Sequence, residues 1–175
     1  MFVKLNKKII VSEYVKNFDV ISYADAIKYA TVTVPIVDIY SLVPERYRDK
    51  FSLLIMEISR PISPHTDSEI LSTINIYVEP DNCVTTFYDF NNDTTVTTRK
   101  LNNQTNGRLF NKEELLPVNS FIANKDEAWL LDVTKPHSVN TVDHRFVVKR
   151  KAIVLQSRYY NYEQVKEMLK ETGYI

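Results

Sequence analysis

Short apolar segments follow one another from residue 51 to residue 157, and polar turn residues separate them. Phe51–Ile58 and Arg150–Ser157 are the clearest of these segments. Short runs rich in β-branched and aromatic residues, recurring at close intervals, are typical of all-β sandwiches and jelly rolls. The chain has only two glycines, Gly107 and Gly173, so its turns must rely on Asn, Asp and Pro. The pattern therefore predicts a mainly β fold built from short strands.

The regions on either side of this β-rich part have patterns that predict helices as well as strands. Residues 22–30 are expected to form a short helix and residues 31–34 a strand, which gives a mixed α/β extension at the amino terminus. Asn161 is a suitable N-cap for a carboxy-terminal helix that Gly173 ends. With 175 residues, the chain is expected to be a single domain (residues 1–175) whose β core spans residues 51–158.

Within the core, two further strands are expected at residues 94–98 and 120–123, and the polar stretch at residues 99–111 is expected to be an exposed loop.

Two of the three histidines lie in similar short motifs, Pro64-His65-Thr66-Asp67 and Pro136-His137-Ser138-Val139. Residues i and i+2 of a strand point to one face, so His65 and Asp67 could bind one ion. With His137 they would form the set of two imidazoles and one carboxylate used by non-haem Fe(II) oxygenases.

Simpler interpretations stand beside this one. A single histidine near an apolar strand is more often a structural hydrogen-bonding group, and only the combination of three ligands favours a metal site. The third histidine, His144, has no partner at metal-ligand spacing and is expected at the surface. No pair of histidines has the helical i, i+4 spacing of zinc proteases.

On the residues His65, Asp67 and His137, followed by a basic residue and an apolar strand, the chain resembles the 2-oxoglutarate and Fe(II)-dependent dioxygenases, in particular their prolyl-hydroxylase-like branch. The resemblance covers about residues 51–158. It implies a double-stranded β-helix (a jelly roll, cupin-like), with these three residues as both iron ligands and catalytic residues. It also implies a basic residue beyond the second histidine that binds the distal carboxylate of 2-oxoglutarate.

Three residues could provide that positive charge: Arg145, Lys149 and Arg150. Arg150 is favoured because it begins the more convincing strand, although a solvated strand end fits it equally well. Asn75 and Tyr77 alternate with apolar residues and are candidate contacts for the co-substrate. For Asn75, capping of a sheet edge or turn is the simpler interpretation.

The resemblance implies Fe(II) as cofactor and 2-oxoglutarate as co-substrate, with O2 consumed and succinate and CO2 released as a C–H bond is hydroxylated. The alternative is a jelly-roll binding or structural module with a degenerate or non-catalytic metal site. A non-oxygenase cupin-like metalloprotein is a third possibility, although such proteins usually use more histidines.

The net charge and the hydropathy of the chain limit the kinds of substrate and partner that are expected. The 22 basic and 22 acidic residues cancel, which makes nucleic acid an unfavoured substrate and leaves an unidentified protein residue or small molecule. The near absence of glycine argues against a glycine-rich phosphate-binding loop. No apolar run approaches the length needed to cross a membrane, and the amino terminus lacks a signal-peptide pattern, so a cytoplasmic protein without a membrane partner is expected.

Overall fold

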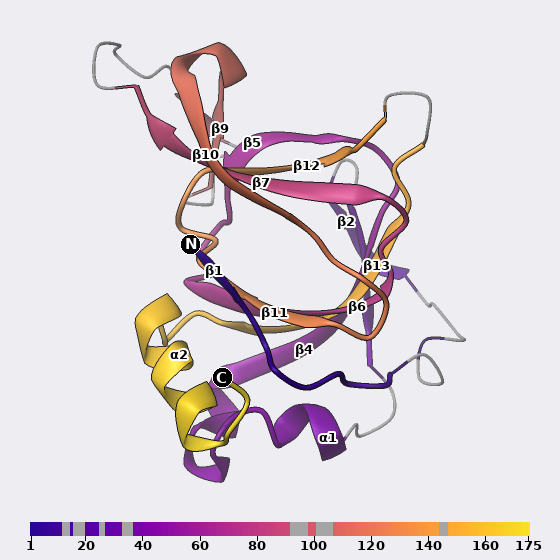
Figure 1. Cartoon of the computed structure of the whole chain (residues 1–175), viewed down its shortest axis with the longest axis vertical. Coiled ribbons are helices and arrows are strands. Elements are labelled where there is room, and N and C mark those ends of the chain that lie inside the picture. Colours follow the sequence, from indigo (N-terminus) through magenta and orange to yellow (C-terminus); the bar gives the residue numbers. More distant parts are fainter. Residues whose placement is uncertain are drawn as a thin grey trace.

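Two antiparallel β-sheets face each other in the computed structural model of the chain (Figure 1). The structure describes residues 1–11, 15, 20–24, 27–32, 37–91, 98–100, 107–143 and 147–175. Among these residues the larger sheet has seven strands in the order β1-β11-β6-β13-β4-β3-β2. Their bounds are Phe2–Lys4 (β1), Val20–Ala24 (β2), Ile27–Thr31 (β3), Phe51–Ile58 (β4), Ser72–Glu79 (β6), Ala128–Leu131 (β11) and Arg150–Ser157 (β13).

The smaller sheet, over the same described residues, has six strands in the order β10-β7-β12-β5-β9-β8. Their bounds are Ile62–Thr66 (β5), Cys83–Phe90 (β7), Thr98–Lys100 (β8), Arg108–Phe110 (β9), Leu115–Ile122 (β10) and His137–Thr141 (β12). From β4 to β7 and again from β10 to β13, each successive strand lies in the opposite sheet. This alternation is the topology of a double-stranded β-helix, which confirms the predicted fold class.

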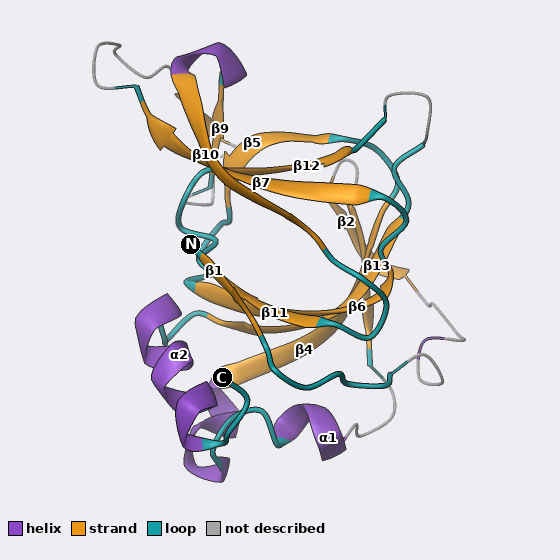
Figure 2. Cartoon of the chain, viewed as in Figure 1, coloured by secondary structure: helices purple, strands orange, loops and turns teal. Residues whose placement is uncertain are grey.

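The β6 strand shows how one sequence pattern serves two cores. Ile74 and Ile76 are fully buried on the outer face of the larger sheet, where helix α2 (Tyr162–Glu171) contributes Val165 and Leu169 to the same apolar cluster. Tyr77 points the other way, into the space between the sheets, because successive side chains of a strand alternate between its faces. Helix α2 accordingly lies against the larger sheet (Figure 2).

The carboxy-terminal helix has the predicted limits. The Asn161 side chain accepts a hydrogen bond from the backbone N–H of Gln164, and the Gln164 side chain accepts one from the backbone N–H of Asn161. This reciprocal capping box satisfies two N–H groups that a helix end leaves unpaired. Shorter helical segments lie at Val37–Tyr40 (α1), Glu45–Lys50 and Lys112–Glu114. In the part of the chain that the structure describes, no helix combines the length and apolar character needed to span a membrane.

The helix predicted over residues 22–30 is wrong. That region instead contains β2 and β3, which pair with each other and extend the larger sheet beyond β4, with Ile27 opposite Ile58 and Thr31 opposite Leu54. Pairing with the exposed edge of β4 outweighs local helix propensity, which is a weak preference that tertiary contacts override. Of the strand predicted at residues 31–34, Thr31 ends β3 and residues 33–34 lie outside the described residues.

The exposed loop predicted over residues 99–111 is wrong at residues 99–100 and 108–110, and residues 101–106 lie outside the described residues. Strands β8 and β9 pair with each other, and β9 continues the smaller sheet beside β5, with Leu109 opposite His65. The strand predicted at residues 120–123 is confirmed as the end of β10. Of the strand predicted at residues 94–98, only Thr98 lies in a described strand, and residues 94–97 lie outside the described residues.

Glu127 fastens the amino-terminal strand to the larger sheet. Its buried carboxylate pairs with the Lys4 ammonium and accepts hydrogen bonds from Asn124 and from the Trp129 indole. Burial alone would raise the pKa of Glu127, but these bonds lower it from 4.5 to about 2. The carboxylate therefore contributes stability that is present above its unfolded-state pKa and is lost as the pH falls towards 2.

The Glu127→Gln variant should consequently unfold more easily at pH 7, by about 2 kcal/mol, because a neutral amide forms weaker hydrogen bonds with the same donors. Urea denaturation at pH 7 and pH 3 measures this difference. The gap between wild type and variant should narrow at pH 3. An equal gap at both pH values would show that the charge of Glu127 contributes nothing.

Candidate metal centre

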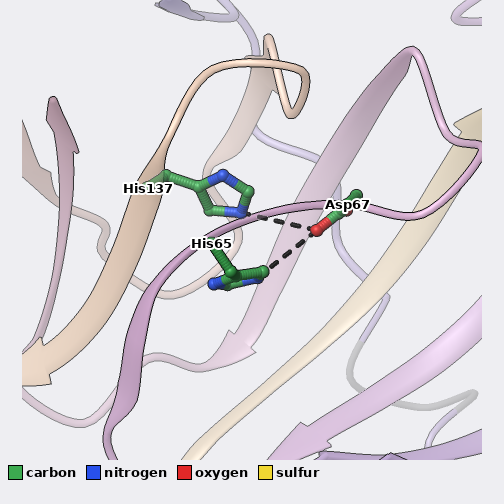
Figure 3. Close-up of side chains that lie close together, drawn as sticks. All are labelled: His65, Asp67 and His137. Atoms are coloured by element: carbon green, nitrogen blue, oxygen red, sulfur yellow. Dashed lines mark ion pairs between the residues drawn. The ribbon is translucent and has the colours of Figure 1, made fainter. Parts of the chain in front are cut away.

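The smaller sheet brings His65, Asp67 and His137 together (Figure 3). His65 on β5 lies opposite His137 on the antiparallel neighbour β12, and Asp67 follows directly after β5. The Nε2 atoms of His65 and His137 lie 3.4 and 3.6 Å from Oδ1 of Asp67. The three potential ligand atoms are all within 4.8 Å of one another, so one ion could contact all three.

Both imidazoles are oriented by the backbone two residues earlier. His65 Nδ1 lies 2.9 Å from the carbonyl oxygen of Ser63, and His137 Nδ1 lies 3.0 Å from that of Lys135. Since a carbonyl can only accept, each Nδ1 carries a proton, and each Nε2 faces the site, where its lone pair can bind a metal when the ring is neutral. The Phe87 ring also stacks on His137, with centroids 5.5 Å apart and an interplanar angle of 26°.

The two histidines have opposite pKa shifts. Burial and the neighbouring His65 lower the pKa of His137 to about 4, so this imidazole is neutral at physiological pH. Burial also acts to lower the pKa of His65, but the hydrogen bond and negative charge of Asp67 outweigh it and raise that pKa. The pKa of Asp67 is lowered by the two imidazoles despite the opposing effect of burial. Without metal, the ionised Asp67 carboxylate thus stabilises the protonated form of His65.

A divalent ion must displace that proton, because a metal ligand has to offer its lone pair. Metal binding should therefore release a proton at pH values below the raised pKa of His65, and affinity should fall as the pH is lowered through it. Calorimetry of Zn(II) binding in buffers of different ionisation enthalpy measures the protons released. A Zn(II) affinity that does not depend on pH, together with a binding heat that does not depend on the buffer, would contradict this account of the site.

A cavity adjoins the three residues. Eight apolar residues line it, together with the polar side chains of Tyr29, Thr73, Asn75, Thr85, Arg150 and Gln156. The triad thus has protein ligands on one side and open space on the other, which is the arrangement that a catalytic metal site requires. Two nitrogens and one carboxylate oxygen in such a site suit Fe(II).

Arg150 is buried within this cavity and is only 1 % exposed, so it is not a solvated strand end. Its guanidinium donates to the Thr85 hydroxyl at 2.8 Å and to the carbonyl oxygen of Cys83 at 3.4 Å, and it lies 5.0 Å from the Tyr77 ring centroid. Within the described residues its Nε has no acceptor and no carboxylate pairs with it. Arg150 is therefore a buried cation with no carboxylate counter-charge among the described residues.

The other candidate cations differ from Arg150. The Lys149 side chain is 65 % exposed and pairs with Glu79 at 3.3 Å, and Lys149 is not among the residues that line the cavity. Arg145 and His144 lie outside the described residues.

The two predicted co-substrate contacts occupy different positions. Asn75 lines the cavity, and its Oδ1 is buried without a hydrogen-bond partner in the described structure. The interpretation of Asn75 as an edge or turn residue is wrong, because β6 lies between β11 and β13 in the interior of the larger sheet. Tyr77 lies beneath the Arg150 guanidinium and does not line the cavity.

No protein-family model matches the sequence, and the search of curated proteins finds no match. Solved structures similar to this chain include the vicilin of hazelnut (Corylus avellana), with a TM-score of 0.43 and 7 % identity over 83 % of this chain and 32 % of that one. The vicilin of Solanum melongena has a TM-score of 0.41 and 10 % identity over 79 % and 30 %. For ycfD of E. coli the TM-score is 0.37, with 9 % identity over 66 % and 28 %.

The chain spans about a third of the length of these matched structures. The assignment of the fold rests on the strand order and on the alternation between the two sheets. The chain has a cupin-like fold.

Several cavity residues were not singled out from the sequence. Thr73 lies two positions before Asn75, and Thr85 lies two positions before Phe87, so strand alternation could have placed both in the interior. Gln156 shares a face of β13 with Arg150 for the same reason. Tyr29 could not have been found in this way, because the strand that carries it was predicted as a helix. Burial and the charge of Asp67 raise the pKa of Tyr29, so it remains a neutral phenol beside the triad.

Proposed function

We propose that the chain is a 2-oxoglutarate- and Fe(II)-dependent dioxygenase that hydroxylates a C–H bond of a protein residue or small molecule. The observation that carries the proposal is the buried Arg150, which shares one cavity with His65, Asp67 and His137. Burying a guanidinium without a carboxylate costs several kcal/mol by general estimates, and proteins seldom retain such a charge without a use. A dicarboxylate bound to the metal at one end would supply the missing counter-charge at the other.

In this proposal His65, Asp67 and His137 hold Fe(II) through their Nε2 and carboxylate oxygen atoms. The bound metal and 2-oxoglutarate supply the oxidising chemistry, in which O2 is consumed, succinate and CO2 are released and a C–H bond is hydroxylated. Arg150 and Thr85 bind the distal carboxylate, where a guanidinium can form two charge-assisted hydrogen bonds. Asn75 lies on the wall of the same cavity and is a further polar contact for the keto acid.

The protein's own contribution is orientation and exclusion of water. The Ser63 and Lys135 carbonyls fix the two imidazoles, and the apolar lining keeps most of the cavity free of polar competitors. A nucleic-acid substrate is not favoured, because the chain has no net charge.

The test is conversion of 2-oxoglutarate to succinate by the purified protein with Fe(II) in air. Conversion should require both Fe(II) and O2, and the Asp67→Ala variant should reduce it to the level of free iron in buffer. A protein that binds Fe(II) through this triad but forms no succinate under any condition would be a non-catalytic metal-binding module instead.

A further inference from the structure

Thr73 and Gln156 form a polar pair at the metal end of the cavity. They lie opposite each other on the neighbouring strands β6 and β13, and both line the cavity. Leu131, the β11 partner of Thr73, lines it too. The chain segment after β11 reaches the triad directly, since the Asp67 backbone N–H donates to the Val133 carbonyl at 3.0 Å. Thr73 and Gln156 therefore lie at the end where the metal would be bound.

Arg150 occupies the opposite end. It pairs with Ile58 in the sheet and donates to Thr85, which lies opposite Val139 on β12, two residues beyond His137. Arg150 and Gln156 are six residues apart on one extended strand, a separation of roughly 20 Å. A five-carbon keto acid that reaches from Arg150 to the metal is too short to reach Gln156 as well. The Thr73–Gln156 pair is left for a second molecule.

Neither polar side chain has a hydrogen-bond partner within the described structure. Thr73 is 4 % exposed, and its hydroxyl oxygen is buried without a hydrogen-bond partner. Gln156 is half-buried, and its side-chain amide forms no hydrogen bond with any residue that the structure describes. An unpaired buried hydroxyl is destabilising, so a group that forms a hydrogen bond with it would bind more tightly.

The surroundings of this pair select for an uncharged group. Leu131 and Val133 are apolar, and the acidic residue that lines this end among the described residues, Asp67, belongs to the triad. The nearby Arg158 is already paired with Glu69 at 2.8 Å. A primary amide such as that of Gln156 offers both donors and an acceptor, and a hydroxyl also offers both. A carboxylate only accepts and would leave the Gln156 carbonyl oxygen without a donor, whereas an ammonium only donates and would leave the Gln156 NH2 group without an acceptor.

We propose that Thr73 and Gln156 bind an amide group of the substrate, with Leu131 and Val133 contacting the adjoining alkyl part. The inference rests on the proposed function, because it assigns the substrate class of the same site. An amide matches the pair best, since it forms two parallel hydrogen bonds with the Gln156 side chain and leaves the Thr73 hydroxyl a further partner.

The experiment compares three probes of one shape, butyramide, butyrate and butylammonium, by saturation-transfer NMR. The protein is loaded with Zn(II), which is redox-inert, and with 2-oxoglutarate. Butyramide should bind roughly tenfold more tightly than either charged probe, as expected for one well-matched polar group. The Gln156→Met and Thr73→Val variants should lose this preference while 2-oxoglutarate binding, measured on the same samples, is unchanged. The Gln156→Glu variant should favour butylammonium instead.

Equal binding of the three probes by wild type, or a preference for butyramide that survives in Gln156→Met, would overturn the inference. If 2-oxoglutarate binds but butyramide is not preferred, only the substrate class is wrong. If 2-oxoglutarate does not bind, the proposed function fails, whichever probe is preferred.

A pentapeptide, Gly-Gly-Gln-Gly-Gly, carries the same amide on a protein side chain. Tighter binding of this peptide than of butyramide supports a protein substrate, and binding that is no tighter supports a small-molecule amide.

Discussion

The His137→Ala variant should lose Fe(II) affinity by more than roughly 100-fold, because it removes one of three ligands whereas loss of an outer contact already costs 10- to 100-fold. The scaffold should remain folded. The β12 backbone stays paired with β5 and β7, and metals in open sites usually bind to a preformed fold. Anaerobic equilibrium dialysis against Fe(II) measures the affinity, and circular dichroism with thermal unfolding measures the fold.

His144 provides the matched control, since His144→Ala removes the chain's third histidine and should leave the Fe(II) affinity unchanged. Two results would count against the triad. Unchanged iron binding in His137→Ala would place the metal elsewhere. Collapse of the fold in that variant would indicate that His137 has a structural role in the packed interior.

The Arg150→Met variant should bind 2-oxoglutarate at least about 2 kcal/mol more weakly, or roughly 30-fold, while its Fe(II) affinity is retained. Methionine preserves much of the side-chain volume and removes the charge. Because the wild type buries this cation without a carboxylate partner among the described residues, the variant should unfold at the same or a higher temperature when 2-oxoglutarate is absent. Added 2-oxoglutarate should stabilise the Fe(II)-loaded wild type and not the variant.

Lys149→Met is the control for charge, because Lys149 is the adjacent residue and is mostly exposed. It should change neither 2-oxoglutarate affinity nor stability by more than a few tenths of a kcal/mol. Arg145→Met tests the remaining candidate. If that variant loses 2-oxoglutarate binding and Arg150→Met does not, the assignment of the co-substrate carboxylate to Arg150 is wrong.

Local patterns in the sequence predicted the central strands well. β4 and β13 have the limits that their apolar runs indicate, and α2 begins at the expected N-cap, Asn161. The same patterns predicted that these side chains come together, because Asp67 follows β5, which carries His65, and His137 begins the strand β12 that pairs with β5. Spacing along the chain was sufficient information for these features.

The remaining features depend on pairing between distant segments, which spacing does not reveal. The β2–β3 hairpin exists because β4 offers an unpaired edge, and β9 is a strand because it lies beside β5. For Asn75, the sequence could not distinguish an edge strand from an interior one. Nor could it show that Arg150 is buried, since its lysine neighbours suggested a solvated position.

The most direct test of the central claim, that the triad and Arg150 form one site for a metal and a keto acid, is anaerobic titration of the purified protein with Fe(II) and then 2-oxoglutarate. Chelation of ferrous iron by the keto acid gives a weak visible charge-transfer band. We expect this band in the wild type, its loss in His65→Ala and Asp67→Ala, and a higher 2-oxoglutarate concentration for half-saturation in Arg150→Met. Absence of the band in the wild type, with Fe(II) left unbound, would contradict the account.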